Sequence, residues 1–305
     1  MLASDIRGWL DRAAEANVVV IGEPIIDRYI HVRPLGKSAK ESIVTFTPIG
    51  TTDYRGGGWI VAAHAGAFAK SVCYRDTHLT PVLKQRYVEH PFRQTLFSIV
   101  ENIQIPESPG VFPPCDILLI ADYGHGLLGA EAVYKISHQS FLALTVQSNS
   151  ANWGFNLLTK WPRADYVVVD EVELRLACAD RYSDIESLAR RQAERMGTEM
   201  FAVTLGHEGC LVINGAKRVW VPAVADRVVD RMGAGDAFLA VTALLVWAGA
   251  PAEVVGLVGN IAGGIKVGKM GNKVVTREEV EQWLKTDLSS SPVEPATLAP
   301  RWCQR

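Results

Sequence analysis

One short stretch joins a glycine turn to a carboxylate at the start of an apolar segment. Residues 230–236 read Asp-Arg-Met-Gly-Ala-Gly-Asp, and the chain continues from Asp236 as an apolar run of helical length. A helix N-terminus offers unpaired N–H groups and a partial positive charge, and glycines let an anion approach the backbone closely. Gly233, Ala234 and Gly235 are therefore a candidate anion cradle.

Asp236 stands directly beside this cradle. A carboxylate next to an anion site is costly unless it takes part in chemistry, and accepting a proton from a hydroxyl that attacks phosphorus is such chemistry. The alternative is structural, because an Asp is favourable wherever a helix begins.

The elements that must position this loop alternate between short β-rich runs and helical patterns. This alternation predicts one α/β domain with a mostly parallel sheet and helices on both faces. The β-rich runs are 17–22, 116–122, 141–148, 165–170, 199–206 and 209–214. The helical candidates are 129–139, 171–179, 184–196, 233–248, 252–268 and 276–285, after an amphipathic helix pattern at the N-terminus.

Residues 22–95 depart from the alternation. Strand-like pieces at 27–32, 42–50 and 77–90 are interrupted by a glycine-led helix, and they do not fit a parallel sheet. We expect them to form a small antiparallel sheet that projects over the carboxyl edge of the core as a lid, with its strands within 28–55 and 77–90. The domain spans 1–286, and the Ser- and Pro-rich residues 287–305 predict a disordered tail.

The composition limits the class of protein. The chain has 305 residues, of which 48% are hydrophobic and 21% charged, and its formal charge of -2 gives no attraction to nucleic acid or anionic membranes. The longest apolar run is shorter than the ~20 residues of a membrane span, and no signal peptide is recognisable, so we expect a cytoplasmic protein. The five cysteines, Cys73, Cys115, Cys178, Cys210 and Cys303, are scattered and indicate neither a disulfide framework nor a zinc site.

The motifs together resemble a known family. Residues 230–236 are similar to the D-T-x-G-A-G-D signature of the ribokinase-like (PfkB) carbohydrate kinases, with Arg231 at the position of the usual Thr. Further similarities follow in the family's order: GEPIIDRY to its first strand, RGGGWIVAAHAGAFA to its Gly-Gly motif, VVVDEVELRLA to its N-x-x-E element and TLGHEGCLV to its T-x-G-x-x-G turn. PLGKSAKES and IADYGHGLL look most like the branch that phosphorylates heptose phosphates.

The resemblance implies a fold and an activity. The fold is a ribokinase-like three-layer αβα domain with a β lid, and the activity is transfer of the γ-phosphate of ATP, with Mg2+, to a hydroxyl of a sugar or sugar phosphate. The implied roles are a catalytic base for Asp236; ATP phosphate binding for Gly233, Ala234, Gly235, Thr204, Gly206 and Gly209; substrate binding for Asp27, Gly57 and Gly58; an adenine site near Asn260; and indirect Mg2+ binding for Glu173 and Asp170, the latter in place of the usual Asn.

Several of these residues also have structural interpretations. Asp27 could cap a turn after the first strand, and Glu173 lies early in a helix, where an acidic residue is favourable in any case. Lys37 and Lys40 could be solvated lid charges or could meet a phosphate on the substrate. His125 and His207 have no partners at the spacing of a metal site.

One departure from the family concerns residues 65–76, which read AGAFAKSVCYRD. A usual member carries another strand-helix unit between the Gly-Gly helix and the next lid strand, whereas this chain passes almost directly from one to the other. A homodimer through the lid could cover the exposed edge. A catalytically impaired sugar- or nucleotide-binding protein is the alternative function; a dinucleotide enzyme is disfavoured because no G-x-G-x-x-G follows the first strand.

Overall fold

The β-rich runs of the sequence form a central sheet in the order β12-β11-β10-β9-β8-β7-β1-β4. The structure is a computed structural model, which describes residues 3–75, 80–92, 94–101, 113–136, 141–225 and 227–287. The strands are β1 (Asn17–Gly22), β4 (Ser71–Tyr74), β7 (Ile117–Asp122), β8 (Phe141–Val146), β9 (Tyr166–Asp170), β10 (Met200–Thr204), β11 (Cys210–Asn214) and β12 (Lys217–Val221). The pairings from β4 to β10 are parallel, and β11 and β12 extend that edge antiparallel.

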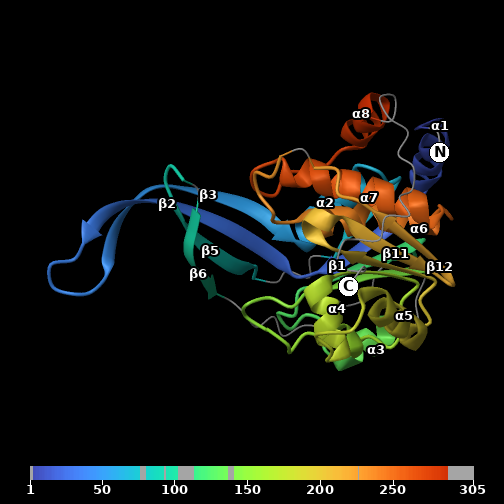
Figure 1. The fold of residues 1–305 in the computed structure, drawn as a ribbon, viewed down its shortest axis with the longest axis horizontal. Coiled ribbons are helices and arrows are strands. Elements are labelled where there is room, and N and C mark those ends of the chain that lie inside the picture. Colours follow the sequence, from blue (N-terminus) through green and yellow to red (C-terminus); the bar gives the residue numbers. More distant parts are fainter. Residues whose placement is uncertain are drawn as a thin grey trace.

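Helices cover both faces of this sheet (Figure 1). They are α1 (Ala3–Ala13), α2 (Gly58–Gly66), α3 (Ala130–Ile136), α4 (Glu171–Cys178), α5 (Ile185–Met196), α6 (Ala234–Trp247), α7 (Ala252–Val267) and α8 (Arg277–Asp287). Figure 1 shows α3, α4 and α5 on one face, and α1, α2, α6, α7 and α8 on the other. Strands buried on both sides read as continuous apolar runs, as in β7, where all residues are buried. The three-layer α/β fold expected from the sequence is confirmed.

Helix α6 is apolar around its whole circumference because it is enclosed on every side. Residues 236–246 are all buried, and the helix packs on β7, β8 and β9 and against α1, α2 and α7. It begins after Gly233, whose φ of 75° lies in the left-handed region. A β-carbon at Gly233 would also lie 3.3 Å from Cε of Lys266, so the tight start of α6 requires glycine.

A second sheet projects from the core in the order β3-β2-β5-β6. Its strands are β2 (Pro24–Lys37), β3 (Val44–Gly57), β5 (Val82–Glu89) and β6 (Gln94–Glu101). The lid is therefore larger than the sequence predicted, since it includes β6. The β2–β3 and β5–β6 pairings are antiparallel, but β2 and β5 are parallel, because the chain returns to the core through α2 and β4 before it enters the lid again.

One short strand, β4, connects α2 to the second part of the lid. The β-rich runs of the sequence did not include β4. Its residues Ser71–Tyr74 pair in parallel with β1 and form the edge of the central sheet. Among residues 71–75 and 80–82, no helix lies between β4 and β5. A short edge strand offers few unpaired backbone groups to solvent.

The remaining expectations concern the cysteines, the termini and membranes. Cys73, Cys115, Cys178 and Cys210 are free thiols, whereas Cys303 and the predicted tail from 288 onward lie outside the described residues. Of the helices that the structure describes, none has the length and apolar character needed to cross a membrane.

Candidate active site

Two cavities meet at the start of α6. The first has a volume of about 310 Å³ and lies between the lid strands β2 and β5 and the core, with Asp27, Lys84, Gln147 and Asp236 in its wall. The second has a volume of about 480 Å³ and lies beside α7, with Gly206, Gly209, Asn260 and Gly264 in its wall. The residues that line both cavities are Thr204, Arg231, Ala234 and Gly235. A molecule in one cavity can therefore reach a molecule in the other across the Gly-Ala-Gly turn.

Asp236 lies in the first turn of α6 and is 7% exposed. Its Oδ1 accepts a hydrogen bond of 2.9 Å from the Tyr123 hydroxyl and one of 3.4 Å from Nε2 of Gln147. Burial raises the pKa of Asp236 to about 6, while the hydrogen bond from Tyr123 acts in the opposite direction. The carboxylate is thus ionised at neutral pH and close to the pKa suited to accepting a proton.

Asp27 is buried at the base of the lid. Arg86 on β5 forms an ion pair with its Oδ1, and Nδ2 of Asn272 donates a hydrogen bond of 2.7 Å to its Oδ2. Both partners come from other parts of the chain, so the structural interpretation as a local turn cap is wrong. The carboxylate lines the first cavity, where its remaining lone pairs can accept hydrogen bonds from hydroxyl groups.

Gly57 and Gly58 lie where α2 begins, against the junction of β1 and β2. The φ of Gly57 is 61°, and a β-carbon there would lie 2.2 Å from the Glu23 carbonyl oxygen. The Gly58 N–H donates a hydrogen bond of 2.9 Å to the same carbonyl. Gly57 lines the first cavity, whereas Gly58 lines neither cavity. These glycines allow close backbone packing that shapes the cavity floor.

Two charged side chains, Asp230 and Lys266, hold the cradle loop. The Asp230 carboxylate accepts hydrogen bonds of 3.0 Å from the N–H groups of Met232 and Gly271. The buried Lys266 ammonium on α7 donates a hydrogen bond of 2.6 Å to the Met232 carbonyl. Gly235 is open to the cavities, because a β-carbon there would have no neighbour within 4 Å.

The expected nucleotide residues lie around the second cavity. Thr204 ends β10, and Gly206 and Gly209 follow it with φ of 60° and 98°. A β-carbon at Gly209 would lie 2.0 Å from the Val221 carbonyl oxygen. Asn260 on α7 lines this cavity, and its Nδ2 donates hydrogen bonds of 2.9 Å to the carbonyls of Val221 and Pro222. Asn260 thus fixes the cavity wall.

Asp170 and Glu173 form a capping box at the start of α4. Oδ1 of Asp170 accepts a hydrogen bond of 2.7 Å from the Glu173 N–H, and Oε2 of Glu173 accepts one of 2.9 Å from the Asp170 N–H. Both carboxylates also line the first cavity. Burial and their mutual repulsion raise the pKa of Glu173 to about 8. Two adjacent carboxylates with raised pKa are suited to a cation near the phosphates, although the described residues hold no cluster of three or more metal-binding side chains.

The chain is similar to known proteins over the segments that form this site. The pfkB family carbohydrate kinase model matches residues 141–278, which include α4, the turn after Thr204 and the 230–236 loop. The chain is 25% identical over 340 residues to the bifunctional protein HldE of Koribacter versatilis, covering 97% of this chain and 67% of that protein. It is 30% identical over 188 residues to HldE of Desulfatibacillum aliphaticivorans, covering 59% of this chain and 37% of that protein. The resemblance of the chain to the pfkB family of carbohydrate kinases is confirmed over residues 141–278.

Solved structures of low identity establish the fold of this chain. Ribokinase from Thermotoga maritima superposes with a TM-score of 0.69 at 19% identity, covering 88% of this chain and 99% of that one. Arabidopsis thaliana ribokinase complexed with ribose and ATP gives a TM-score of 0.64 at 16% identity, covering 90% and 100%. The chain spans only a third to two thirds of the length of the HldE relatives named above.

The residues of the first cavity that the sequence did not reveal include Tyr123, Gln147, Lys84 and Asn272. Tyr123 and Gln147 directly follow β7 and β8, and residues at the carboxyl ends of parallel strands share one edge of the sheet, so this signal was available. Lys84 lies in the lid strand β5, which contains both polar and apolar residues. A lysine in such a strand is expected to face solvent.

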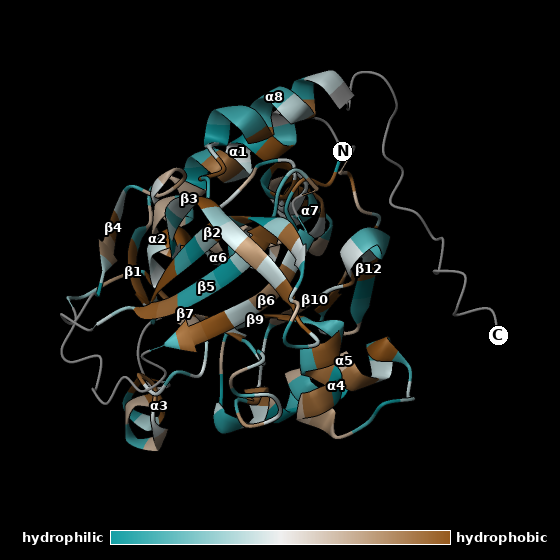
Figure 2. Ribbon diagram, turned by 90° about the vertical axis from the view of Figure 1, so that its left-hand side faces the viewer, coloured by the Kyte–Doolittle hydropathy of each residue, from teal (hydrophilic) through white to brown (hydrophobic). Residues whose placement is uncertain are grey.

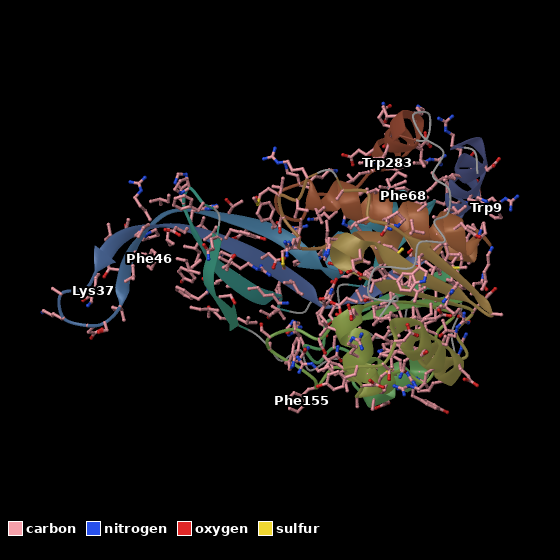
Figure 3. All side chains as sticks on the ribbon, viewed as in Figure 1. Trp9, Lys37, Phe46, Phe68, Phe155 and Trp283 are labelled. Carbon is pink, nitrogen blue, oxygen red and sulfur yellow. The ribbon has the colours of Figure 1, made fainter. Side chains whose placement is uncertain are left out.

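The other polar residues considered from the sequence differ in their position relative to the two cavities. Lys37 and Lys40 are exposed on the lid hairpin and line neither cavity, and Figure 3 shows Lys37 near the far end of the hairpin. His207 lines the second cavity. His125 is 1% exposed, and burial lowers its pKa to about 4, so the imidazole is neutral.

Proposed function

We propose that this protein is a carbohydrate kinase of the pfkB type, which transfers the γ-phosphate of ATP to a hydroxyl of a sugar phosphate. The observation that carries the proposal is the position of Asp236. Its carboxylate lines the smaller cavity at the point where both cavities share the Gly-Ala-Gly turn. A base in this position faces an acceptor on one side and a nucleotide phosphate on the other.

In this mechanism, Asp236 accepts the proton of the attacking hydroxyl as the oxygen–phosphorus bond forms. The N–H groups at the start of α6 stabilise the negative charge that develops on the transferred phosphoryl group. Arg231, whose guanidinium has no ion-pair partner in the described ranges, lines both cavities and adds positive charge at the same place. Asp170 and Glu173 would hold Mg2+ through water, and Mg2+ supplies further charge neutralisation when it is bound.

The second cavity is the proposed nucleotide site. Its apolar walls come from Val224, Val228, Phe238 and Val267, and α7 presents Gly263 and Gly264, which leave room for a planar base. The phosphates would extend toward Thr204 and the turn at Gly235. The likeness to a ribokinase that was solved with ribose and ATP supports this arrangement.

Lys84 favours a phosphorylated acceptor. Its side chain lines the first cavity, burial lowers its pKa, and it forms no ion pair or hydrogen bond with the residues that the structure describes. Arg86 beside it already pairs with Asp27. A partly buried ammonium without a partner is costly, so an anionic group on the substrate would stabilise it. The fold likeness to phosphofructokinase-2, which was solved with fructose-6-phosphate, is consistent with this class. A heptose phosphate is our specific proposal, because PLGKSAKES and IADYGHGLL resemble the branch that phosphorylates heptose phosphates.

A paired comparison tests the substrate class. ATP, Mg2+ and a panel of sugar phosphates, including heptose phosphates, are assayed beside the corresponding free sugars. Lys84→Met should raise KM for the phosphorylated acceptor about tenfold or more, as expected for losing a charge-assisted contact. Lys37→Met, on the lid hairpin away from the cavity, should leave KM unchanged.

Two other outcomes would contradict this proposal. If free sugars were used as well as their phosphates and Lys84→Met changed nothing, the anionic acceptor would be wrong. ATP binding without transfer to any acceptor would instead favour a sugar- or nucleotide-binding protein.

We also propose a homodimer formed through the lid, in the cytoplasm. The lid exposes large apolar side chains, and Figure 2, which looks onto the lid end, shows hydrophobic stretches along its strands. The exposed apolar residues are Leu35, Ile43, Val44, Ile49, Phe92, Phe97 and Ile99. Such a set on a sheet with two open edges is typical of a surface that pairs with another chain.

A further inference from the structure

The hydroxyl of Tyr123 makes the shortest hydrogen bond to Asp236. Tyr123 directly follows β7 and is 2% exposed, and its hydroxyl donates to Oδ1 of Asp236 over 2.9 Å. Gln147 reaches the same oxygen over 3.4 Å. No donor in the described part of the chain reaches Oδ2, which leaves this oxygen for the substrate.

Tyr123 is itself held by buried polar groups from two other segments. Its N–H donates to Oε2 of Glu23 over 3.0 Å. Its carbonyl accepts hydrogen bonds of 2.9 Å from Asn149 and 2.7 Å from Asn152. Glu23 also accepts the His125 N–H over 2.9 Å, so its carboxylate spans the backbone on both sides of Gly124. These bonds fix the tyrosine before any ligand arrives.

Packing alone does not require a hydroxyl at this position. Phenylalanine would fill the same space without a polar group that needs a partner. Burial and the neighbouring Asp236 raise the pKa of Tyr123 well above its usual value, so it stays protonated and donates throughout the working pH range. The hydroxyl is therefore a permanent donor to one oxygen of the base.

The charges that shift the pKa of Asp236 come from three elements, and the charge of Asp236 in turn raises the pKa of Glu173 on α4. Asp27 on β2 raises the pKa of Asp236, while Lys84 on β5 and Lys266 on α7 lower it. None of these three forms a hydrogen bond with Asp236 within the described ranges. Tyr123 is the neighbour that both orients the carboxylate and stabilises its ionised form.

We infer that Tyr123 is a positioning residue for phosphoryl transfer: its hydroxyl holds Oδ1 of Asp236, so that Oδ2 points to the acceptor hydroxyl as the proton-accepting oxygen. This inference rests on the proposed function for its kinetic consequences. No proton passes through Tyr123. The substrate proton moves to Oδ2, and the hydrogen bond to Oδ1 persists on the protonated acid.

The test compares two buried tyrosines. Tyr166 also donates a 2.9 Å hydrogen bond, to Oγ1 of Thr242, and is fully buried away from both cavities, so Tyr166→Phe is the matched control. In Tyr123→Phe, kcat at pH 7 should fall roughly tenfold or more with little change in either KM, because ground-state contacts remain. The acidic limb of the kcat profile should move up by about one pH unit, since a donor to the carboxylate is lost.

Tyr166→Phe should change neither the acidic limb nor kcat at pH 7. If Tyr123→Phe kept the parent kcat and pH profile, the inference would be overturned.

A second measurement does not depend on activity. The pKa of the Asp236 carboxyl is followed by carbon-13 NMR of labelled aspartate, with Asp236→Asn to assign the signal. Tyr123→Phe should raise this pKa by about one pH unit relative to the parent, and Tyr166→Phe should not. An unchanged pKa in Tyr123→Phe would refute the inference even if the parent transferred no phosphate, an outcome that would separately refute the proposed kinase.

Discussion

At the scale of single residues, the position of Asp236 makes a direct prediction. Asp236→Asn keeps an oxygen that can accept the Tyr123 hydrogen bond but removes the base, so kcat should fall by roughly 10²-fold or more. ATP affinity and melting temperature should stay near those of the parent. In the parent, activity should rise as pH rises through about 6, because the ionised form is the active one. Steady-state kinetics across pH measures both effects, and a normal kcat would remove Asp236 from the mechanism.

Gly235 provides a test of the anion cradle. A β-carbon there meets nothing within 4 Å, so Gly235→Val should fold, while its side chain projects into the space that the two cavities share. ATP affinity should weaken at least tenfold, since the phosphates can no longer approach the N–H groups. Acceptor binding measured without ATP should be nearly unchanged. Unaltered ATP binding in a calorimetric titration would place the phosphates elsewhere.

The sequence indicated Asp236 as a candidate base but not the environment of its carboxylate. Asp236 can be recognised from a local pattern, because it follows a glycine turn and begins an apolar run. Tyr123 lies 113 residues away and meets Asp236 only because α6 crosses the end of β7, a relation that no local pattern contains. Lys84 was missed for a different reason: an alternating strand does not show which of its faces will be covered.

At the scale of elements, the start of α4 should set the magnesium requirement. The side chain in Glu173→Gln can still accept the capping hydrogen bond from the Asp170 N–H, but it has no negative charge. The Mg2+ concentration that gives half of the maximal rate should therefore rise several-fold to about tenfold. This is the order expected when a group that supports the metal ligands is lost. In the parent, apparent Mg2+ affinity should fall as pH falls through about 8, because protonation of Glu173 competes with the cation.

The neighbouring Glu171 is a matched control for this prediction. It lies in the same helical turn and pairs with Arg175. Glu171→Gln should leave the Mg2+ dependence unchanged. An equal response of both variants would indicate a general effect on α4 rather than a local effect on the cation.

The elements themselves were largely predictable because β-branched runs and helical patterns mark them strongly. In the central sheet, the strands that were not predicted are short or mixed in composition: β4 has four residues, and β12 carries two cations in its Lys-Arg-Val-Trp-Val sequence. Both lie at edges of the sheet, where half of the backbone is unpaired and the demand for apolar residues is weaker. The parallel β2–β5 pairing depends on how the chain re-enters the lid, and residue patterns do not encode this.

At the scale of the whole molecule, the exposed lid predicts a dimer. Phe97 is 51% exposed and stacks on Tyr87 with 4.4 Å between ring centroids, and it lies among the apolar lid residues. Light scattering across a wide dilution range should give a dimer for the parent and a shift toward monomer for Phe97→Asp. Phe155→Asp is the control, because Phe155 is 93% exposed on the core, away from the lid (Figure 3). A parent that is monomeric at every concentration would contradict the dimer.

The two partners of Asp27 join regions that are far apart in the chain. Arg86 belongs to the lid, whereas Asn272 belongs to the segment that follows α7, the helix beside the nucleotide cavity. An acceptor that binds the Asp27 carboxylate should therefore also change its contacts with Arg86 and Asn272. Through these contacts, we expect acceptor binding to affect the proposed nucleotide site as well. Linkage then requires reciprocity: whatever factor the acceptor contributes to ATP affinity, ATP must contribute to acceptor affinity. Asn272→Ala should bring that factor closer to one. The affinity for ATP would then depend less on whether the acceptor is bound, and the affinity for the acceptor would depend less on whether ATP is bound.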